Sequence, residues 1–484
     1  MRHISRSTKA MVVATLLLVV ALPLLITACG GSDDGDETET TMTHETAAAD
    51  DVQIAMSELA RLAPAASSAD LRAAASSLMA FGIDLYDILA TDAGQGNLVF
   101  SPSSIMTALA MTYAGAAGVT AEEIATALNL TLEGDALHRA LNSLDAALES
   151  RSWSKTDPEG KETGVLVKTA NSLWGQKGIA FDKLFLDTLA ANYGAGMRLV
   201  DYKTAAEEAR AAINRWVAGE TNDKIPELIP QGTLDALTRL VLVNAVYLDA
   251  TWQSQFDPAM TKDGPFTTQA GDAVITPMMT QKEMLPYAAG DGWQAVELAY
   301  VGDELAMTLV VPDEGRFEEL EGLLPAGLLD EVVRELDSSA GELGSAAGAP
   351  GSAAGELGAG SEEARTLAQV QLTMPKFEFR TQTGLRAALA ALGMKSAFSP
   401  GEADFSGMTT EEPLFISDVI HEAYIAVDEE GTEAAAATAV VMRASGMPPD
   451  ELVELTIDRP FMFALRDRET GAVLFLGRVT DPTA

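Results

Sequence analysis

The spacing of apolar residues changes along this chain from a helical period to a strand period. Apolar residues recur every three or four positions over residues 71–89, and Thr120 and Glu123 stand at capping-box spacing before another apolar stripe, so helices are expected at both places. After residue 240 the apolar runs are short, β-branched or aromatic, and bounded by Gly, Pro or Asp, which predicts strands. These runs are 240–247, 305–311, 370–379 and 473–479. Helices first and strands later, without regular alternation, predict an α+β fold rather than a doubly wound sheet.

The composition of the 484 residues limits the partners and the chemistry that this chain can use. Hydrophobic residues make up 47 %, which is enough to bury a large core. Asp and Glu number 71 against 32 Lys and Arg, and the net charge of -39 repels polyanions, so nucleic acid is not expected as a partner. One cysteine and four histidines provide neither a disulfide framework nor a cysteine-built metal site, so no metal is expected.

Residues 1–28 have the layout of an export signal. A basic start precedes an apolar run over residues 11–26, which is shorter than a comfortable membrane span. The run ends in the sequence ITACG, which resembles the signal of bacterial lipoproteins, in which cleavage leaves the cysteine, here Cys29, to carry a lipid. The alternative is an ordinary secretory signal with an incidental cysteine. In both cases the protein is expected to be extracellular, either secreted or anchored to the cell surface by lipid.

Two segments of biased composition organise the rest of the chain. Residues 29–67 are predicted to be a flexible tether, because most of this segment is rich in Asp, Glu, Gly, Ser and Thr and cannot form a core. Residues 68–484 are predicted to form the folded domain. Within it, residues 338–363 repeat patterns such as AGEL and GSAAG, which predicts a flexible surface insertion, with partner binding as the alternative.

Motifs for catalysis are incomplete in this chain. His421 and Glu422 begin like the helix of a zinc protease, but Ile425 stands in the place of the second histidine. Gly94 and Gly96 lack the third glycine of a dinucleotide-binding loop, and no serine lies in a nucleophile-elbow pattern. The chain is therefore not expected to be an enzyme.

Four passages, in the order in which they occur, resemble the serpin family. They are NLVFSPSSI (97–105), NRWV (214–217) with LVLVNAVY (240–247), HEA (421–423) with EEGTEAAAAT (429–438), and DRPFMF (458–463) with GAVLFLGRV (471–479). The resemblance implies a fold of three β-sheets with about nine helices and an exposed reactive-centre loop. It covers the chain from residue 68 to its end, apart from the insertion.

The resemblance also implies a mechanism. Serpins usually inhibit serine proteases, and sometimes cysteine proteases. The loop is cut like a substrate, and its amino-terminal arm then enters the central sheet as a new strand while the protease stays attached as an acyl-enzyme. The catalytic serine belongs to the protease, so no cofactor is expected, and the inhibitor is expected to be a monomer.

The segment after Glu429 can be compared with what this mechanism demands. A strand that enters a sheet buries every second side chain, so those side chains must be small and uncharged. Counting from the flexible Gly431, the inward face carries Thr432, Ala434, Ala436 and Thr438, and the other face carries Glu433, Ala435 and Ala437. Since all four inward side chains are small, residues 429–438 are interpreted as the hinge of an inhibitory loop. An alanine-rich helix or a non-inhibitory loop is the alternative.

The family's usual spacing from Gly431 places the cleaved bond between Ser445 and Gly446. A small residue before that bond suits elastase-like or subtilisin-like proteases with a shallow or apolar primary pocket. The competing bond, between Arg443 and Ala444, suits trypsin-like proteases and shortens the inserted arm by two residues.

By resemblance, further residues control how the central sheet opens. They are Ser101, Ser104, Asn244 and His421 in a polar cluster beneath the point where the sheet parts, Trp252 at the top of the opening, and Glu429 at the base of the loop. Buried hydroxyl, amide and imidazole groups can exchange hydrogen bonds as strands separate. The alternative is that His421 and Trp252 are ordinary core residues.

The sequence therefore predicts an inhibitor of extracellular serine proteases that acts as a suicide substrate. Its expected partners are those proteases and, through the lipid, a membrane. A non-inhibitory binding or chaperone-like protein with the same fold is the alternative.

Overall fold

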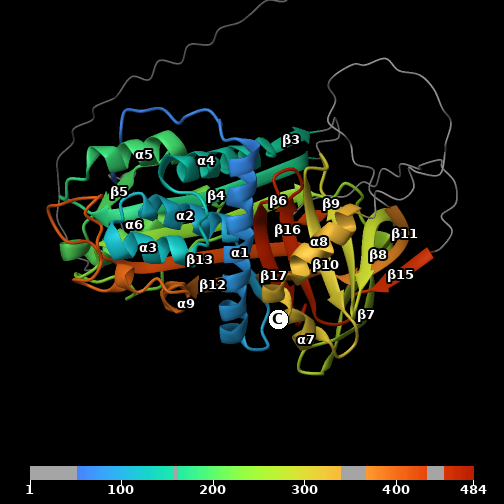
Figure 1. Cartoon of the computed structure of the whole chain (residues 1–484). Helices are drawn as coiled ribbons and strands as arrows, with labels where there is room; N and C mark the ends of the chain where they lie inside the picture. The colour runs from blue at the N-terminus through green and yellow to red at the C-terminus, as the bar shows by residue number, and fades with distance from the viewer. Residues whose placement is uncertain (1–51, 157–161, 339–366, 433–451) are drawn as a thin grey trace, which may run out of the picture. The chain divides into compact units, whose positions relative to one another are not determined.

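The computed structural model describes residues 52–156, 162–338, 367–432 and 452–484 (Figure 1). Over these residues the chain forms nine α-helices and two hydrogen-bonded sheets of eight and nine strands. The nine-stranded sheet divides at one long shared strand, so three sheets are described below. The helices are α1 (Ser68–Ala93), α2 (Pro102–Tyr113), α3 (Gly118–Ala127), α4 (Gly134–Ser150), α5 (Lys183–Tyr193), α6 (Tyr202–Glu220), α7 (Phe317–Glu321), α8 (Leu328–Ser338) and α9 (Arg386–Ala391). The long, apolar α1 has the length of a membrane span, but much of it is buried against α2, α4 and β17, as in a core helix.

The first sheet, called the central sheet below, has the strand order β1-β5-β4-β6-β14-β13-β12, with β3 paired to β4. Its strands are β1 (Gln53–Ala55), β3 (Trp153–Thr156), β4 (Glu162–Gln176), β5 (Met197–Val200), β6 (Leu240–Thr251), β12 (Phe377–Gly384), β13 (Ile416–Val427) and β14 (Gly431–Thr432). Alternate residues of β6 enter different cores: Leu240 and Leu242 pack with the residues of α2, whereas Val241 packs with those of α6. Burial on both faces explains why β6 is apolar at most positions.

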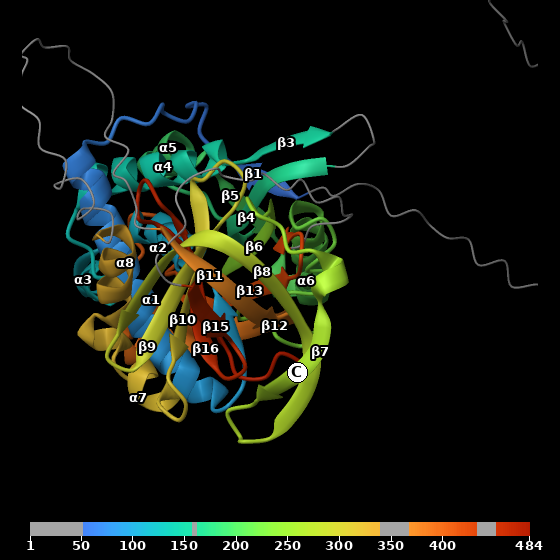
Figure 2. The same cartoon turned by 90° about the vertical axis from the view of Figure 1, so that its right-hand side faces the viewer.

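The second and third sheets share β8 (Ala273–Gly290), whose early residues pair with β7 and β11 and whose last residues pair with β9 (Figure 2). Beyond β9 the order continues through β10, β16 and β17 to β2, while β15 runs parallel to β11 at the other edge. The strands are β2 (Leu98–Phe100), β7 (Lys262–Thr267), β9 (Trp293–Ala299), β10 (Leu305–Pro312), β11 (Leu367–Pro375), β15 (Leu452–Thr456), β16 (Phe461–Asp467) and β17 (Val473–Val479).

Two sequence-based expectations differ from these elements. The run 370–379 was expected to be one strand, but the chain changes sheets at Lys376, between β11 and β12. The second helix starts at Gly118, so Thr120 lies inside α3 and is no cap; it accepts a hydrogen bond from the Asp404 backbone, and Glu123 accepts bonds from Ser396. The capping spacing therefore marked a tertiary contact with the segment after α9.

Residues 52–67, which the sequence assigned to the flexible tether, are ordered against the fold. β1 pairs antiparallel with β5 at the edge of the central sheet. The Arg61 guanidinium donates hydrogen bonds to Asn142 (2.7 Å), Asp145 (2.6 Å) and Glu149 (2.8 Å), all on α4. The predicted start of folded structure at Ser68 is thus too late, because apolar residues and Arg61 follow the acidic stretch and give this segment contacts.

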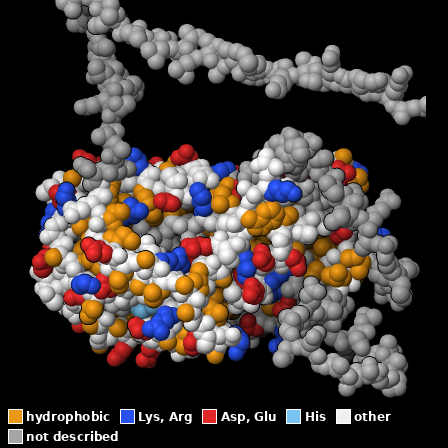
Figure 3. All heavy atoms as spheres, turned by 90° about the horizontal axis from the view of Figure 1, so that it is seen from above, with side chains coloured by type: hydrophobic (Ala, Val, Ile, Leu, Met, Phe, Trp, Pro, Cys, Tyr) orange, Lys and Arg blue, Asp and Glu red, His pale blue; other side chains and the backbone are white. Residues whose placement is uncertain are grey.

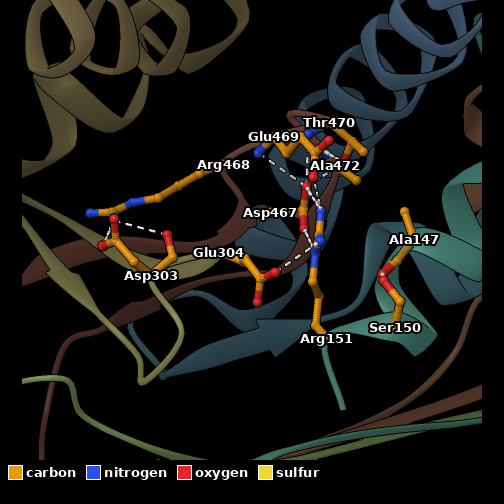
Figure 4. A network of polar contacts seen from close by, with 10 residues as sticks. All are labelled: Ala147, Ser150, Arg151, Asp303, Glu304, Asp467, Arg468, Glu469, Thr470 and Ala472. Atoms are coloured by element: carbon orange, nitrogen blue, oxygen red, sulfur yellow. Dashed lines mark hydrogen bonds and ion pairs between the residues drawn. The ribbon is translucent and has the colours of Figure 1, made fainter. Parts of the chain in front are cut away.

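A buried ion network ties the end of α4 to the hairpin between β16 and β17 (Figure 4). Arg151 donates to Asp467 (2.6 Å), Glu469 (2.6 Å) and Glu304 (3.2 Å). Asp467 has no exposed side-chain surface and also accepts hydrogen bonds from the backbone and hydroxyl of Thr470. This carboxylate therefore accepts hydrogen bonds both from the buried guanidinium of Arg151 and from the turn at Thr470.

We expect Asp467→Ala to lower the free energy of unfolding by about 3 kcal/mol, because it leaves the guanidinium of Arg151 buried without its main partner. The matched control is Glu469→Ala, which removes a partner of the same arginine whose side chain is 75 % exposed, and it should cost less than about 1 kcal/mol. Urea titrations followed by circular dichroism measure both values. Equal losses in the two variants would contradict the role given to Asp467.

Candidate functional site

The central sheet opens between two neighbouring strands, β6 and β13. Their parallel ladder joins Leu240–Val246 to Ile416–Ala423 and stops there. Above this point β14 lies between them: Gly431 pairs with Thr251, and Thr432 pairs with Ala250 of β6 and Val427 of β13. Two residues of the predicted hinge therefore already occupy the position of an additional strand.

A tight turn brings the chain back from β13 into this opening. The Asp428 carboxylate accepts hydrogen bonds from the backbone N–H groups of Glu430 and Gly431, and the Asp428 N–H donates to the Gly431 carbonyl. A side chain at Gly431 would place its Cβ 2.0 Å from the carbonyl oxygen of Ala250, so this position requires glycine for close backbone approach.

Aromatic residues hold the turn and the start of β14 in place. The Tyr300 hydroxyl lies 2.6 Å from the hydroxyl of Thr432, whose side chain is only 2 % exposed. The Trp252 ring stacks on Tyr300 with centroids 4.5 Å apart, and its indole N–H donates to the Asp428 carbonyl (3.0 Å). Burial raises the pKa of Tyr300 well above its usual range, so the phenol is neutral and can donate or accept.

Glu429 anchors the outer side of the same turn. Its carboxylate accepts hydrogen bonds from the Lys376 ammonium (2.6 Å) and the Thr261 hydroxyl (2.7 Å). Burial disfavours the charged carboxylate, but these two bonds outweigh it and hold the pKa of Glu429 below its usual value. The base of the loop is therefore tied to the residue at which the chain passes from β11 to β12.

A buried polar cluster lies beneath the opening, where β6 and β13 are still paired. Its members are Ser101, Ser104, Asn171, Asn244 and His421. The His421 Nε2 accepts a hydrogen bond from the Ser101 backbone N–H, so its Nδ1 carries the proton and donates to the Asn244 side-chain oxygen. Asn244 donates in turn to the Ser104 hydroxyl and to Asn171. The cluster thus bridges β4, β6, β13 and the start of α2.

The environment of His421 keeps the imidazole neutral. The side chain is completely buried, and desolvation lowers its pKa to about 3. Glu422 on the opposite face of β13 shows the converse effect, since burial raises its pKa to about 7 although Arg380 lies 3.5 Å away. Both residues lie on the strand β13, so they do not belong to a zinc-protease helix.

Other kinds of site find little support in the described parts of the chain. No group of three or more His, Cys, Asp and Glu residues there is placed to hold a metal ion. On the face seen in Figure 3, acidic and basic side chains are interspersed with apolar ones, and the basic side chains do not gather into one patch.

The structure thus brings together most predicted residues that it describes and adds several that sequence reasoning missed. The missed residues are Asn171, Lys376, Asp428 and Tyr300. Asn171, Lys376 and Tyr300 act through contacts between distant segments, so no local pattern could have indicated them. Asp428 accepts hydrogen bonds from residues two and three positions on, so the sequence DEEG carried a local turn signal for it. The remaining predicted residues lie outside the described residues; they are Cys29, Glu433, Ala434, Ala435, Ala436, Ala437, Thr438, Arg443, Ala444, Ser445 and Gly446.

Comparisons with known proteins agree with this geometry. The family model described as serpin (serine protease inhibitor) matches residues 76–343 and 358–482. An uncharacterized serpin-like protein of Thermococcus kodakarensis is 38 % identical over 403 residues, covering 83 % of this chain and 84 % of the relative. The leukocyte elastase inhibitor of Equus caballus is 35 % identical over 406 residues, covering 83 % and 97 %. The native structure of the thermophilic serpin tengpin aligns with a TM-score of 0.71 at 24 % identity, covering 89 % and 99 %. These similarities confirm the predicted fold class.

We expect His421 to make the protein sensitive to acid. The unfolded chain protonates this histidine below a pH of about 6.5, whereas the folded protein resists protonation down to a pH of about 3, so its contribution to stability is lost progressively as the pH falls between these values. Between pH 7 and pH 5 the loss is about 2 kcal/mol. His421→Gln should not show this loss of stability between pH 7 and pH 5, although we expect it to be less stable than the wild type at pH 7.

The measurement is urea unfolding of the wild type and His421→Gln at several pH values. His44→Gln, in the predicted tether, is the control and should keep the pH dependence of the wild type. Parallel pH profiles for the wild type and His421→Gln would show that His421 is protonated in the folded protein.

Proposed function

Because this chain belongs to the serpin family, we propose that it inhibits extracellular serine proteases by suicide-substrate trapping. In this proposal the protease cleaves the reactive-centre loop, the amino-terminal arm of the loop enters the central sheet, and the protease stays attached as an acyl-enzyme. Family membership and the elastase-inhibitor relatives support protease inhibition in general. The chain acts on a protease and is not itself a catalyst, and no cofactor takes part.

The observation that carries the proposal is the position of Gly431 and Thr432 between β6 and β13. Thr432 lies opposite Ala250 and Val427, so continuing the same register by six residues brings Thr438 opposite Asn244 and His421. Insertion to that point must part the hydrogen bond between Asn244 and His421. The hydroxyl of a threonine can then bond to both groups, so no buried polar group needs to lose its partner.

The side chains of the arm suit this path. Ala434 and Ala436 follow Thr432 on the inward face and add little volume to a core that is already packed. Glu433 falls on the other face, where water can keep it charged. A large or charged inward side chain would cost several kcal/mol on burial and slow insertion.

The energy for trapping comes from the sheet itself. Fourteen residues of strand span roughly 45 Å, so complete insertion carries the attached protease across most of the domain. The uncut form must be kinetically trapped, with a central sheet that lacks one full strand. Burial of the arm and new hydrogen bonds along β6 and β13 then stabilise the cleaved form.

We propose that the cleaved bond joins Ser445 to Gly446 and that the target is elastase-like or subtilisin-like. The spacing from Gly431 and the elastase-inhibitor relatives support this choice. A bond between Arg443 and Ala444, with a trypsin-like target, is the competing choice. We further propose export, lipid attachment at Cys29 and a monomeric inhibitor, on the basis of the sequence.

Incubation with elastase should give a complex that resists SDS. Ala434→Arg should abolish the complex and convert the protein to a cleaved substrate, because this side chain must enter the core. The matched control is Ala435→Arg, which adds the same side chain on the other face and should retain most of the complex. Clean cleavage of the wild type without a complex would instead support a non-inhibitory binding protein, and mass spectrometry of the released carboxy-terminal peptide identifies the cleaved bond.

Cleavage of the loop should also raise the melting temperature by tens of degrees, because insertion adds a strand to the center of the sheet. Differential scanning calorimetry before and after limited proteolysis measures the change. Ala434→Arg is the control and should show a much smaller rise. An unchanged melting temperature after cleavage of the wild type would rule out insertion.

A further inference from the structure

We propose that Tyr300 is a positioning residue that holds the hinge in the central sheet before cleavage, so that insertion starts from Thr432. This inference rests on the proposed function and adds a residue that sequence reasoning did not identify. It depends on one buried contact, between the hydroxyls of Tyr300 and Thr432 at 2.6 Å.

Tyr300 is itself held rigidly in place. It follows directly after β9, forms a bridge with Trp252, and donates its backbone N–H to the Leu305 carbonyl. The next residue, Val301, donates its N–H to the carbonyl of Thr251, the residue of β6 that pairs with Gly431. Backbone hydrogen bonds on both sides of the residue therefore fix the position of the phenol next to the opening.

The ring of Tyr300 has a packing role that the hydroxyl does not share. The stacked Trp252 ring bonds to the turn through Asp428 and needs only the aromatic surface of Tyr300. The hydroxyl instead forms its hydrogen bond with the hinge, at Thr432. A phenylalanine at this position keeps the stack and removes only the contact with the hinge.

Loss of the hydroxyl should favour withdrawal of the hinge. Thr432 is 2 % exposed, so its hydroxyl would stay buried without a partner unless β14 leaves the opening and reaches water. A buried hydrogen bond of this kind changes the ratio of inserted to withdrawn hinge by about five-fold. Insertion of the cleaved arm then begins later, while hydrolysis of the acyl-enzyme keeps its rate, so more inhibitor is released as cleaved product.

The test is a double-mutant cycle with Tyr300→Phe and Thr432→Val in the full-length protein. With elastase as the protease, each single variant should raise the ratio of cleaved inhibitor to SDS-resistant complex about five-fold. The double variant should show less than the product of the two single effects, because neither hydroxyl is left without a partner. Tyr86→Phe is the control, since it removes another buried phenol bond, to Glu321, far along the chain from the hinge, and it should leave the ratio unchanged.

Hydrogen exchange of the intact protein gives a second readout that needs no protease. Tyr300→Phe should raise the exchange rate of the peptide that contains residues 428–432 about five-fold, whereas Tyr86→Phe should not. If the wild type forms no complex, the proposed function fails, and the exchange result alone decides whether Tyr300 holds the hinge. Wild-type values of both the product ratio and the exchange rate in Tyr300→Phe would overturn the inference.

Discussion

The pairing of β6 with β13 is the interaction on which the rest of this structure depends. Seven residues of β6 are joined to β13, and both faces of β6 are buried by helices or by the opposing core. The pairing must be strong enough to keep the sheet closed, yet it ends at Val246 and leaves room for β14. A stable fold and an opening for a new strand therefore lie within one pair of strands.

The polar cluster shows how the two demands are reconciled. An apolar core at this level would be more stable but would offer nothing specific to an incoming strand. Asn244 and His421 instead hold β6 and β13 together through a hydrogen bond that a threonine hydroxyl can replace. The proposed insertion requires a neutral imidazole, because a charged one would need a counterion inside the sheet. The same burial that keeps His421 neutral makes the folded state sensitive to acid.

Local sequence patterns predicted the strands that correspond to continuous runs of apolar residues. The run at Leu240 became β6 and the run at Val473 became β17, because each strand has apolar side chains on both faces. Patterns failed where tertiary contacts decide the outcome: Thr120 looks like a helix cap but serves the segment after α9. At the site, the alternation of small residues after Gly431 was visible in the sequence, whereas the partners Tyr300 and Asn171 depend on pairings between distant segments.

The segment that precedes α1 has a mechanical consequence. Between β1, where this segment joins the sheet, and β14 lie the strands β5, β4 and β6. A force that pulls on residue 52 would first act on the short pairing of β1 with β5. It would then act on the hydrogen bonds of Arg61 to α4, at the margin of the domain. Tension on the amino-terminal segment would therefore reach the opening between β6 and β13 last, so that under the proposed mechanism an inhibitor attached at this end could still insert its loop.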